Sequence, residues 1–292
     1  MEILAFPGAF AKATQLAEQL KCPVRKTDLH LFPDEESLVQ LPPDPAAEVI
    51  VYQSLDHPNP RLIELLLLAR TARDLGVRHL TLVAPYLCYM RQDKAFQPGQ
   101  AVSQQIIGRF LADLFDAVIT VDPHLHRVRS MAQAVPAKQA LALSASRLIG
   151  EFIRQRHPDV LLVGPDSESA QWVSEVAQSG GMDFVVAHKI RHGDTAVEIS
   201  LPAFDYSGRD AVIVDDIASS GHTLATAATQ LFEQGIRSVS VVVTHALFMG
   251  DALERIRRVG VESIWSTDSV EHETNVISLA PLLAEGIHQL KE

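Results

Sequence analysis

Cysteine is scarce in this chain of 292 residues, which contains only Cys22 and Cys88. Both cysteines lie among apolar residues, and their separation matches neither a metal-ligand spacing nor a redox motif. A disulfide framework and a thiolate metal site are therefore not expected. We interpret both thiols as reduced side chains that serve packing.

Basic residues and long apolar runs are also scarce. Lys and Arg total 25 against 36 Asp and Glu, a formal net charge of −11, which argues against nucleic acid or an anionic membrane as a partner. A phosphorylated metabolite remains possible, because it needs only a local cluster of donors. The most apolar run, Leu65–Ala69, is far too short to span a bilayer, and the first residues lack the features of a signal peptide. These absences predict a soluble cytoplasmic protein.

Short β-branched runs alternate with segments of helical periodicity along the whole chain, a pattern typical of parallel sheets covered by helices on both faces. We therefore expect an α/β protein. The predicted strands lie at residues 3–6, 49–53, 80–84, 118–121, 160–163, 184–187, 212–214 and 239–243. The predicted helices lie at residues 60–75, 103–114, 145–156, 168–178 and 224–233.

The alternating pattern runs twice, once before and once after the Ala-rich stretch at 132–145. With 47% hydrophobic residues, the chain is long enough for two cores of ordinary size. We therefore expect two similar α/β domains, residues 1–143 and residues 144–292.

The most informative stretch reads VIVDDIASSGHTL, from Val212 to Leu224. A β-branched run ends in Asp215 and Asp216, small and polar residues follow, and a helical pattern then begins. The first N–H groups of such a helix have no backbone partners, and together with the helix dipole they favour an anion. The two acids would repel that anion, so we expect them to face sugar hydroxyls, a Mg²⁺ ion, or both. An ordinary strand and capped helix would also fit, but two adjacent acids at a strand end are costly without a ligand.

VIVDDIASSGHTL resembles the phosphoribosyl-diphosphate (PRPP) binding motif of the type I phosphoribosyltransferase fold. Four further segments resemble motifs of the ribose-phosphate diphosphokinases, also called PRPP synthetases: FPDEE (32–36), SLDHPNPRLIELL (54–66), PYLCYMRQDK (85–94) and DPH (122–124). They occur in the order of that family and cover nearly the whole chain. The chain is thereby identified as a member of the family, similar to its shorter, archaeal-like type, which implies two phosphoribosyltransferase-like domains.

The resemblance implies a Mg²⁺-dependent transfer of the diphosphoryl group of ATP to the anomeric hydroxyl of ribose 5-phosphate, giving PRPP and AMP for nucleotide biosynthesis. Such a transfer depends mainly on positioning and on electrostatic stabilisation. The resemblance assigns ATP to the N-terminal domain and ribose 5-phosphate to the C-terminal domain.

On the ATP side, the resemblance assigns contacts to Arg91 and Gln92, because a guanidinium suits phosphate oxygens and an amide can bind nucleotide edges. Phe32, Asp34 and Glu36 match a loop that supplies an adenine pocket to a neighbouring subunit. This match implies a homo-oligomer, at least a dimer, with a shared nucleotide site. Taken alone, Arg91 would be interpreted as a surface ion-pair residue, and FPDEE as an ordinary turn.

Metal binding and catalysis are assigned by the resemblance to four residues. His124 matches a histidine that helps to bind the Mg²⁺–nucleotide, and Asp166, after a predicted strand, matches an acid that contacts the metal and ribose 5-phosphate. Lys189 and Arg191 match the cation pair of a catalytic loop, where they would stabilise charge that develops during transfer. Taken alone, His124 would be a capping or packing residue, and the two cations would mark a solvated strand end.

The resemblance assigns the sugar phosphate to the VIVDDIASSGHTL segment (212–224) and to Asp166. Two acids would hold the ribose hydroxyls, and the loop behind them would hold the 5-phosphate. The expected residues that bind ribose 5-phosphate are Asp166, Asp215, Asp216, Ser219, Ser220, Gly221 and Thr223.

The chain departs from the family pattern at several positions. His222 stands where a small residue is usual, and Glu168 adds a negative charge to a segment that is commonly glycine-rich. Glu35 replaces the glycine of FPDGE, and Gln40 stands where an arginine is common. Residues 97–103 lack a basic residue associated with allosteric phosphate binding in longer members. We therefore expect weak or absent inhibition by ADP; non-competitive inhibition at physiological ADP concentrations would contradict this expectation.

Alternatives to an active PRPP synthetase remain open. Glu168 and His222 motivate a non-catalytic homologue that binds nucleotide or PRPP without turnover, whereas the retained Lys189 and Arg191 favour catalysis. The residues do not distinguish a PRPP synthetase from an enzyme of the same fold that uses another pentose phosphate or another nucleoside triphosphate. A PRPP-consuming transferase is least favoured, because RQDK and FPDEE would then have no purpose.

Overall fold

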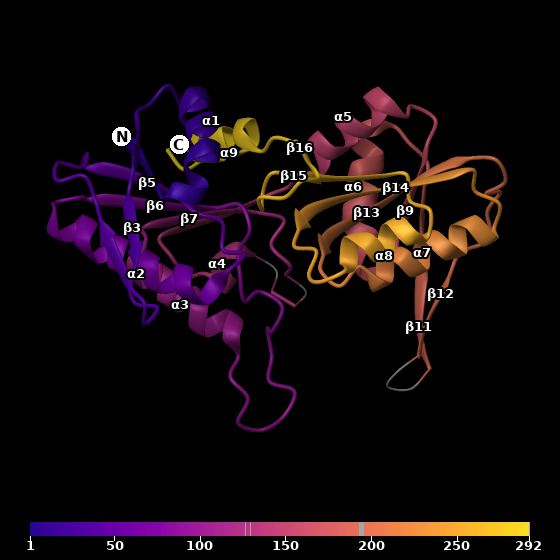
Figure 1. The fold of residues 1–292 in the computed structure, drawn as a ribbon, viewed down its shortest axis with the longest axis horizontal. Coiled ribbons are helices and arrows are strands. Elements are labelled where there is room, and N and C mark those ends of the chain that lie inside the picture. Colours follow the sequence, from indigo (N-terminus) through magenta and orange to yellow (C-terminus); the bar gives the residue numbers. More distant parts are fainter. Residues whose placement is uncertain (126, 129, 193–195, 292) are drawn as a thin grey trace. The chain divides into compact units, whose positions relative to one another are not determined.

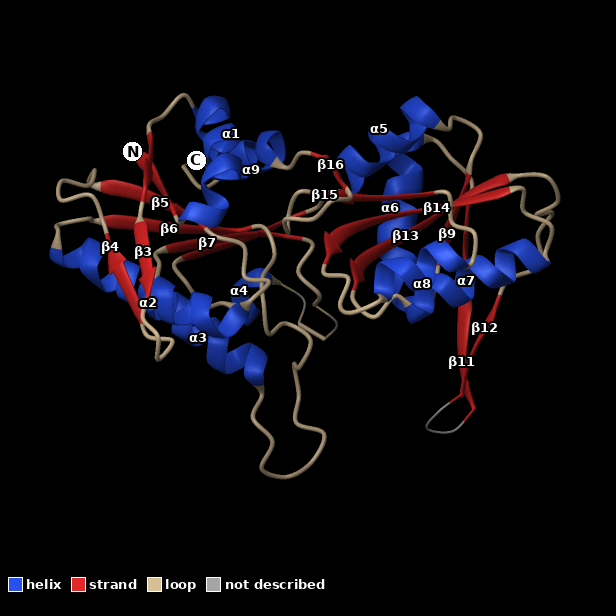
Figure 2. Ribbon diagram, in the orientation of Figure 1, coloured by secondary structure: helices blue, strands red, loops and turns tan. Residues whose placement is uncertain are grey.

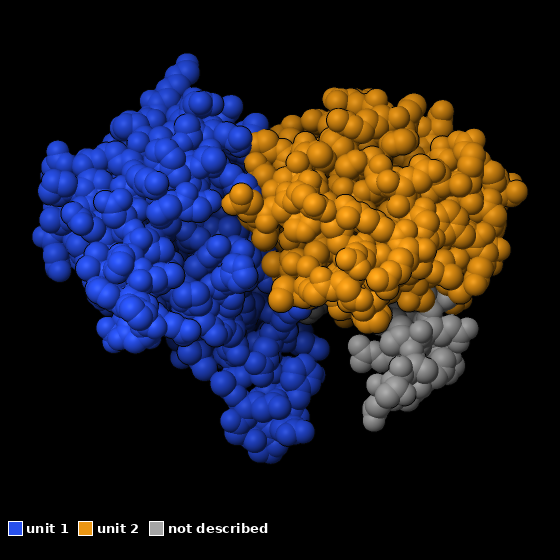
Figure 3. Space-filling model, in the orientation of Figure 1, with its two compact units in different colours: residues 1–143, 279–292 blue, residues 144–278 orange. Residues whose placement is uncertain are grey.

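The computed structural model describes residues 1–125, 127–128, 130–192 and 196–291, and the side chains of 189–192 and 196–199 lie outside the description. The chain divides into two compact units (Figure 3). Unit 1 comprises Met1–Leu143 and Leu279–Glu292, and unit 2 comprises Ser144–Ser278. Each unit is built on one six-stranded sheet (Figure 1). The expected α/β class with two mostly parallel sheets is confirmed.

The sheet of unit 1 has the strand order β2-β1-β5-β6-β7-β8, and all neighbouring pairs are parallel. Its strands are β1 (Glu2–Ala5), β2 (Val24–Lys26), β5 (Glu48–Tyr52), β6 (His79–Ala84), β7 (Ala117–Val121) and β8 (Gln139–Leu143). Figure 2 shows α1 (Phe10–Leu20) and α9 (Ala280–Gln289) on one face, and α2 (Pro58–Asp74), α3 (Ser103–Leu114) and the short α4 (Met131–Ala134) on the other. Burial of apolar side chains between α2, α3 and the sheet holds this unit together; the core includes Leu65, Leu68, Leu80, Leu82 and Leu111.

The sheet of unit 2 has the strand order β10-β9-β13-β14-β15-β16, again with parallel neighbours only. Its strands are β9 (Leu161–Gly164), β10 (Phe184–Val186), β13 (Asp210–Ala218), β14 (Ser238–Ala246), β15 (Ser263–Thr267) and β16 (Asn275–Ile277). Helix α5 (Ser146–Arg156) packs on α6 (Ala170–Gly180), and α7 (His222–Glu233) packs on α8 (Ala252–Arg258). The core beneath α7 and α8 includes Leu161, Ile213, Leu224, Leu231 and Ile256.

The two units repeat one topology. In each unit the second strand in chain order lies at one edge of the sheet, and an antiparallel hairpin follows it. The hairpin of unit 1 consists of β3 (Asp28–Leu31) and β4 (Ser37–Gln40), and the hairpin of unit 2 consists of β11 (His188–His192) and β12 (Ala196–Ser200). Because parallel strands end at the same edge of a sheet, each unit gathers its loops at one carboxyl edge.

The end of the chain does not follow the expected domain division. We expected residues 144–292 to form the second domain, but Leu279–Glu292 belong to unit 1. Helix α9 packs against α1, β7 and β8, where burial of Leu282, Leu283 and Ile287 covers one face of the first sheet.

The structure has no helix, within its described residues, that is long and apolar enough to cross a membrane. Cys22 and Cys88 are free thiols. Burial raises the pKa of the Cys88 thiol to about 12, so this side chain stays protonated and serves packing.

Candidate functional site

Three carboxylates gather at the carboxyl edge of the unit 2 sheet. Asp166 follows β9, and Asp215 and Asp216 lie near the end of β13, the strand paired with β9. Asp216 is buried, and Asp215 is partly exposed. The protein around Asp215 removes part of its carboxyl group from water, and this desolvation, together with the negative charges of Asp216 and Asp166, raises the pKa of Asp215 well above its usual range. Such a concentration of carboxylates is unfavourable by itself and is typical of a binding site.

The loop after these acids leads into the start of α7. Gly221 has a φ of 72° in the left-handed region, and no side chain caps the helix that begins at His222. A Cβ at Gly221 would lie only 3.0 Å from the Ala252 carbonyl oxygen, so both the backbone conformation and the close approach of α8 require glycine here. Because no side chain caps the start of α7, its first N–H groups can face an anion.

The segment between β14 and α8 holds this loop in place. The carbonyl of Ala218 accepts a hydrogen bond from the Phe248 N–H at 2.9 Å, and the carbonyl of Ser219 accepts one from the Met249 N–H at 2.9 Å. Arg255 donates to the Ser220 carbonyl. These three hydrogen bonds hold the loop carbonyls against the segment before α8 and against α8 itself.

His222 and Glu168 do not disturb the local backbone. His222 is exposed as the first residue of α7 and is absent from the residues with positive φ; the left-handed position belongs to Gly221. Glu168 is also exposed, and its N–H donates to Asp166 Oδ1 at 2.9 Å. The Ser169 N–H donates to the same oxygen at 3.3 Å, so Asp166 caps the turn that enters α6. Both departures are compatible with an anion site at this edge.

The predicted catalytic cations lie on the hairpin of unit 2. Lys189 and Arg191 belong to β11, where their backbones pair with Ile199 and Val197 of β12. Their side chains lie outside the described residues. The backbone places both on the segment that leaves the edge strand β10.

Two predicted ATP contacts, Arg91 and Gln92, and the predicted catalytic and metal-binding residue His124 lie on two loops at the carboxyl edge of the unit 1 sheet. Arg91 and Gln92 follow β6, and His124 follows β7, the neighbouring strand. Arg91 is exposed, and Gln92 is partly buried with its Oε1 bound by Ser103 Oγ at 2.8 Å. The Leu125 N–H donates to the Pro123 carbonyl at 2.7 Å, which makes a tight turn centred on His124. The sheet thus brings these residues to one edge.

Sequence reasoning missed Asp122 as a candidate in the same loop. Asp122 is 5% exposed, its φ is 37°, and its N–H donates to the Leu143 carbonyl at 2.9 Å. A buried non-glycine residue in the left-handed region directly before proline is strained, and such strain persists mainly where surrounding structure and function require it. In the sequence, Asp122 stood out only as part of the DPH segment (122–124), with no role of its own.

The remaining predicted ATP residues occupy the tip of the unit 1 hairpin. Phe32, Asp34 and Glu36 are all exposed, with 41% of Phe32 accessible. The Glu35 N–H donates to the Phe32 carbonyl at 2.9 Å, and the Phe32 N–H donates to the Glu36 carbonyl at 2.9 Å. Glu35 has a φ of 70°. This pattern is a three-residue hairpin loop whose last position favours glycine.

Replacing Glu35 by glycine is expected to stabilise the protein by about 0.5–1 kcal/mol, because glycine removes the cost of a Cβ in the left-handed region but loses more entropy on folding. Thermal unfolding of the Glu35→Gly variant measures this effect. The Glu36→Gly variant is the control, because it removes the same charge from the same hairpin tip. Glu36 has no positive φ, so its variant should be less stable than the parent. If the Glu35→Gly variant is no more stable than the Glu36→Gly variant, the backbone of Glu35 is not strained by its positive φ.

Oxygen donors suit magnesium at the acidic edge of unit 2. No group of three or more His, Cys, Asp or Glu side chains in the described part of the chain could hold a metal ion. Mg²⁺ usually binds one or two protein carboxylates together with substrate phosphates and water. The carboxylates of Asp166, Asp215 and Asp216, which meet at the ends of neighbouring strands, are oxygen donors of the kind that such an ion binds. Of the two predicted ligands, Asp166 belongs to this edge and His124 belongs to unit 1.

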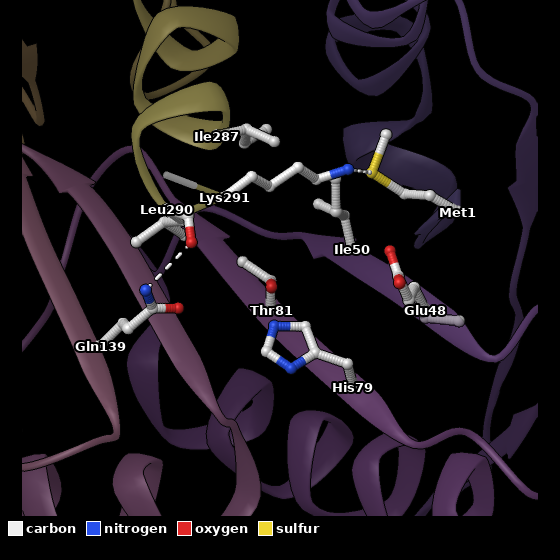
Figure 4. Close-up of a pocket in the computed structure, with 10 residues that line it drawn as sticks. Met1, Glu48, Ile50, His79, Thr81, Gln139, Ile287, Leu290 and Lys291 are labelled. Carbon is white, nitrogen blue, oxygen red and sulfur yellow. Dashed lines mark hydrogen bonds between the residues drawn. The ribbon is translucent and has the colours of Figure 1, made fainter.

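A cavity of about 300 Å³ in unit 1 lies at the other edge of its sheet (Figure 4). Glu48, His79 and Gln139, which begin β5, β6 and β8, line it together with Lys291. None of the predicted site residues lines this cavity. Ligands of open parallel sheets bind at the carboxyl ends of the strands, so the cavity is separate from the candidate site.

Known proteins resemble this chain along its whole length. Residues 1–116 match the family model described as the N-terminal domain of ribose phosphate pyrophosphokinase, and residues 132–277 match the phosphoribosyl transferase domain. The chain is 32% identical to the ribose-phosphate pyrophosphokinase of Methanopyrus kandleri, with 99% of each chain covered. It is 34% identical to ribose-phosphate pyrophosphokinase 2 of Archaeoglobus fulgidus, with 98% of this chain and 100% of the relative covered.

A solved structure shares the fold. The crystal structure of phosphoribosylpyrophosphate synthetase from Mycobacterium smegmatis superimposes with a TM-score of 0.84 at 24% identity. The match covers 99% of this chain and 98% of that chain. The order of strands and helices in both units is therefore that of a known two-domain architecture.

Proposed function

The chain belongs to the ribose-phosphate pyrophosphokinase family, and we propose that it transfers the diphosphoryl group of ATP to the 1-hydroxyl of ribose 5-phosphate. The O1 oxygen attacks the β-phosphorus, the bond between the β-phosphorus and the α–β bridging oxygen breaks, and AMP leaves. The hydroxyl proton is released, and the sugar product is PRPP. The enzyme acts in the cytoplasm for nucleotide biosynthesis, as the sequence predicted.

The observation that carries this proposal is the carboxyl edge of unit 2, where paired acids precede an uncapped helix. Asp215 and Asp216 can accept hydrogen bonds from the ribose hydroxyls, because carboxylates are strong acceptors. The 5-phosphate binds the first N–H groups of α7 and the hydroxyls of Ser219, Ser220 and Thr223, and Gly221 provides the turn. The helix end suits the phosphate, and the acids suit the hydroxyls. A sugar phosphate satisfies both ends of the site.

Unit 1 supplies the ATP site in this proposal. Arg91 binds phosphate oxygens, which its exposed guanidinium can reach, and Gln92 hydrogen-bonds the nucleotide. His124, at the tight turn after β7, contacts the nucleotide phosphates and their metal.

The exposed hairpin tip supports a nucleotide site that is shared between subunits. Phe32, Asp34 and Glu36 offer a ring and two carboxylates to solvent at the end of β3 and the start of β4. We propose that they complete the adenine pocket of a neighbouring copy in a homo-oligomer, at least a dimer.

In unit 2, Asp166 would bind magnesium together with substrate oxygens, and in unit 1 His124 would contact the metal of the nucleotide. Magnesium would neutralise phosphate charge as the diphosphoryl group moves. Lys189 and Arg191 stabilise the same developing charge in the transition state. Asp166 is held by its capping hydrogen bonds to the Glu168 and Ser169 N–H groups, which fixes its orientation.

A non-catalytic homologue gains no support from the two residues that motivated it. His222 has ordinary helical geometry, and Glu168 is exposed. An enzyme that uses another pentose phosphate would share the site described above, so the acceptor has to be tested with competing sugars.

The products identify the reaction. Phosphorus NMR of ATP, Mg²⁺, ribose 5-phosphate and the enzyme should show AMP and a sugar-linked diphosphate in equal amounts. ADP with inorganic phosphate would indicate hydrolysis of ATP, and ADP with a sugar bisphosphate would indicate transfer of a single phosphoryl group. Either result would contradict diphosphoryl transfer. Reactions with ribose, arabinose and xylulose 5-phosphates under the same conditions identify the preferred acceptor.

A further inference from the structure

Asp93 is a buried acid within the RQDK segment. Only 1% of its side chain is exposed. Its Oδ1 accepts a hydrogen bond from Arg127 Nη1 at 2.7 Å, and its Oδ2 accepts one from the Arg127 backbone N–H at 3.2 Å. One carboxylate therefore binds both the side chain and the main chain of Arg127.

These hydrogen bonds join two loops that leave neighbouring strands. Asp93 comes directly after Arg91 and Gln92 in the loop behind β6, and Arg127 lies three residues beyond His124 in the loop behind β7. Arg91 and Gln92, two of the predicted ATP contacts, and His124, the predicted metal-nucleotide residue, are therefore close in sequence to the two ends of one ion pair.

The two loops are also joined at their base. The Val121 N–H donates to the Pro85 carbonyl at 3.2 Å, where β7 ends and the loop behind β6 begins. The contact of Asp93 with Arg127 lies further along both loops. The contact between Asp93 and Arg127 therefore links the outer parts of the two loops, beyond the hydrogen bond at their base.

The other side of the RQDK segment is anchored on α3. The Gln104 N–H donates to the Gln92 carbonyl at 3.2 Å, and Gln104 Nε2 donates to the Met90 carbonyl at 3.1 Å. Ser103 binds the Gln92 side chain. The segment is thus held on α3 at one side and on the loop of His124 at the other.

A carboxylate removed from water is costly unless it is paired and hydrogen-bonded. The cost of burying the Asp93 carboxylate therefore has to be offset by its two hydrogen bonds with Arg127. The negative charge of Asp93 is thus paired with Arg127. We propose that Asp93 is a positioning residue, which acts through Arg127 to hold Arg91 and Gln92 at the correct distance from His124 for ATP. This inference rests on the proposed function, which assigns Arg91, Gln92 and His124 to nucleotide binding in unit 1.

The test is a double-mutant cycle with Asp93→Asn and Arg127→Ala. In Asp93→Asn one carboxylate oxygen becomes an NH2 group, so only one of the two hydrogen bonds from Arg127 can be accepted. KM for ATP should rise about tenfold or more, because a small misplacement of binding groups has a large effect. Arg127→Ala keeps the backbone contact and should have a smaller effect. The double variant should be no worse than Asp93→Asn, since both act through one contact. KM for ribose 5-phosphate should stay unchanged.

A matched control is Asp44→Asn, which removes an exposed carboxylate paired with Arg25 at 2.6 Å in the same unit. This variant should keep the parental KM for ATP. A purely structural role of Asp93 predicts a lower Tm with unchanged kinetic constants of the folded enzyme, and that result would overturn the proposal. So would equal losses of affinity for both substrates, or fully additive effects in the double variant.

The proposal also has a readout that does not need turnover. Calorimetry with α,β-methylene-ATP, in which a methylene group that cannot leave replaces the oxygen between the α- and β-phosphorus atoms, measures nucleotide affinity alone. A protein without diphosphoryl transfer that still loses affinity for this analogue on Asp93→Asn would refute the proposed reaction but support the positioning role. Unchanged affinity for the analogue in Asp93→Asn would refute the positioning role.

Discussion

Replacing Lys189 by alanine is expected to lower kcat for AMP formation by about 10²–10³-fold, because a cation aimed at developing charge contributes mainly in the transition state. KM for ATP and for ribose 5-phosphate should change much less than kcat. The backbone supports this placement, since Lys189 lies on β11, the hairpin strand that follows the edge of the unit 2 sheet. Initial rates at saturating concentrations of both substrates measure the effect.

The matched control for this variant lies one residue earlier. His188 belongs to the same strand, is exposed and pairs with Ser200 at the base of the hairpin. His188→Ala should retain the parental kcat. Equal losses in the two variants would indicate a general disturbance of the hairpin. A Lys189→Ala variant with unchanged kcat and a raised KM would make the lysine a ground-state contact and contradict its proposed role.

Replacing Asp216 by asparagine is expected to weaken ribose 5-phosphate binding by about 10–100-fold, because hydrogen bonds to a carboxylate contribute about 1.5–3 kcal/mol. Affinity for α,β-methylene-ATP should stay unchanged, since Asp216 belongs to the sugar side. The negative charge of Asp216 contributes to the raised pKa of Asp215. Removing this charge relieves repulsion, so the variant should be at least as stable to heat as the parent.

The same substitution at the other end of the strand provides the control. Asp210 begins β13, and its carboxylate binds Arg237 and Ser238 Oγ. Asp210→Asn should lower thermal stability and leave affinity for ribose 5-phosphate unchanged. Isothermal titration of both variants with the sugar phosphate separates the two effects. Unchanged affinity in Asp216→Asn would remove this residue from the site.

The predicted elements are correct, but the sheet strands β2, β8, β15 and β16 and the helices α1, α4 and α8 were not predicted. Each predicted strand and helix overlaps one in the structure, because buried parallel strands and amphipathic helices leave a clear periodicity. The two hairpins, β3–β4 and β11–β12, were missed, since their short, polar strands lie outside the sheets. Helix α9 was also missed, and its packing on unit 1 depends on tertiary contacts that a local pattern does not contain.

The site residues were predicted from sequence motifs. The structure adds the strand pairing and the backbone conformations that place several of them. The structure brings Asp166 near Asp215 because β9 and β13 are neighbours, a pairing that the sequence does not state. Motif matching raised doubt about His222, whereas the backbone needs glycine only at position 221. The strain at Asp122 and the two contacts of Asp93 were invisible, because both arise from residues distant in sequence.

The most direct test of diphosphoryl transfer is the rate of AMP formation from ATP and Mg²⁺, measured with and without ribose 5-phosphate. We predict AMP only when the sugar phosphate is present, in an amount equal to the PRPP formed, and nearly none with the Lys189→Ala variant. AMP formation that does not depend on ribose 5-phosphate, or its absence in a protein that binds both substrates, would contradict the proposed function.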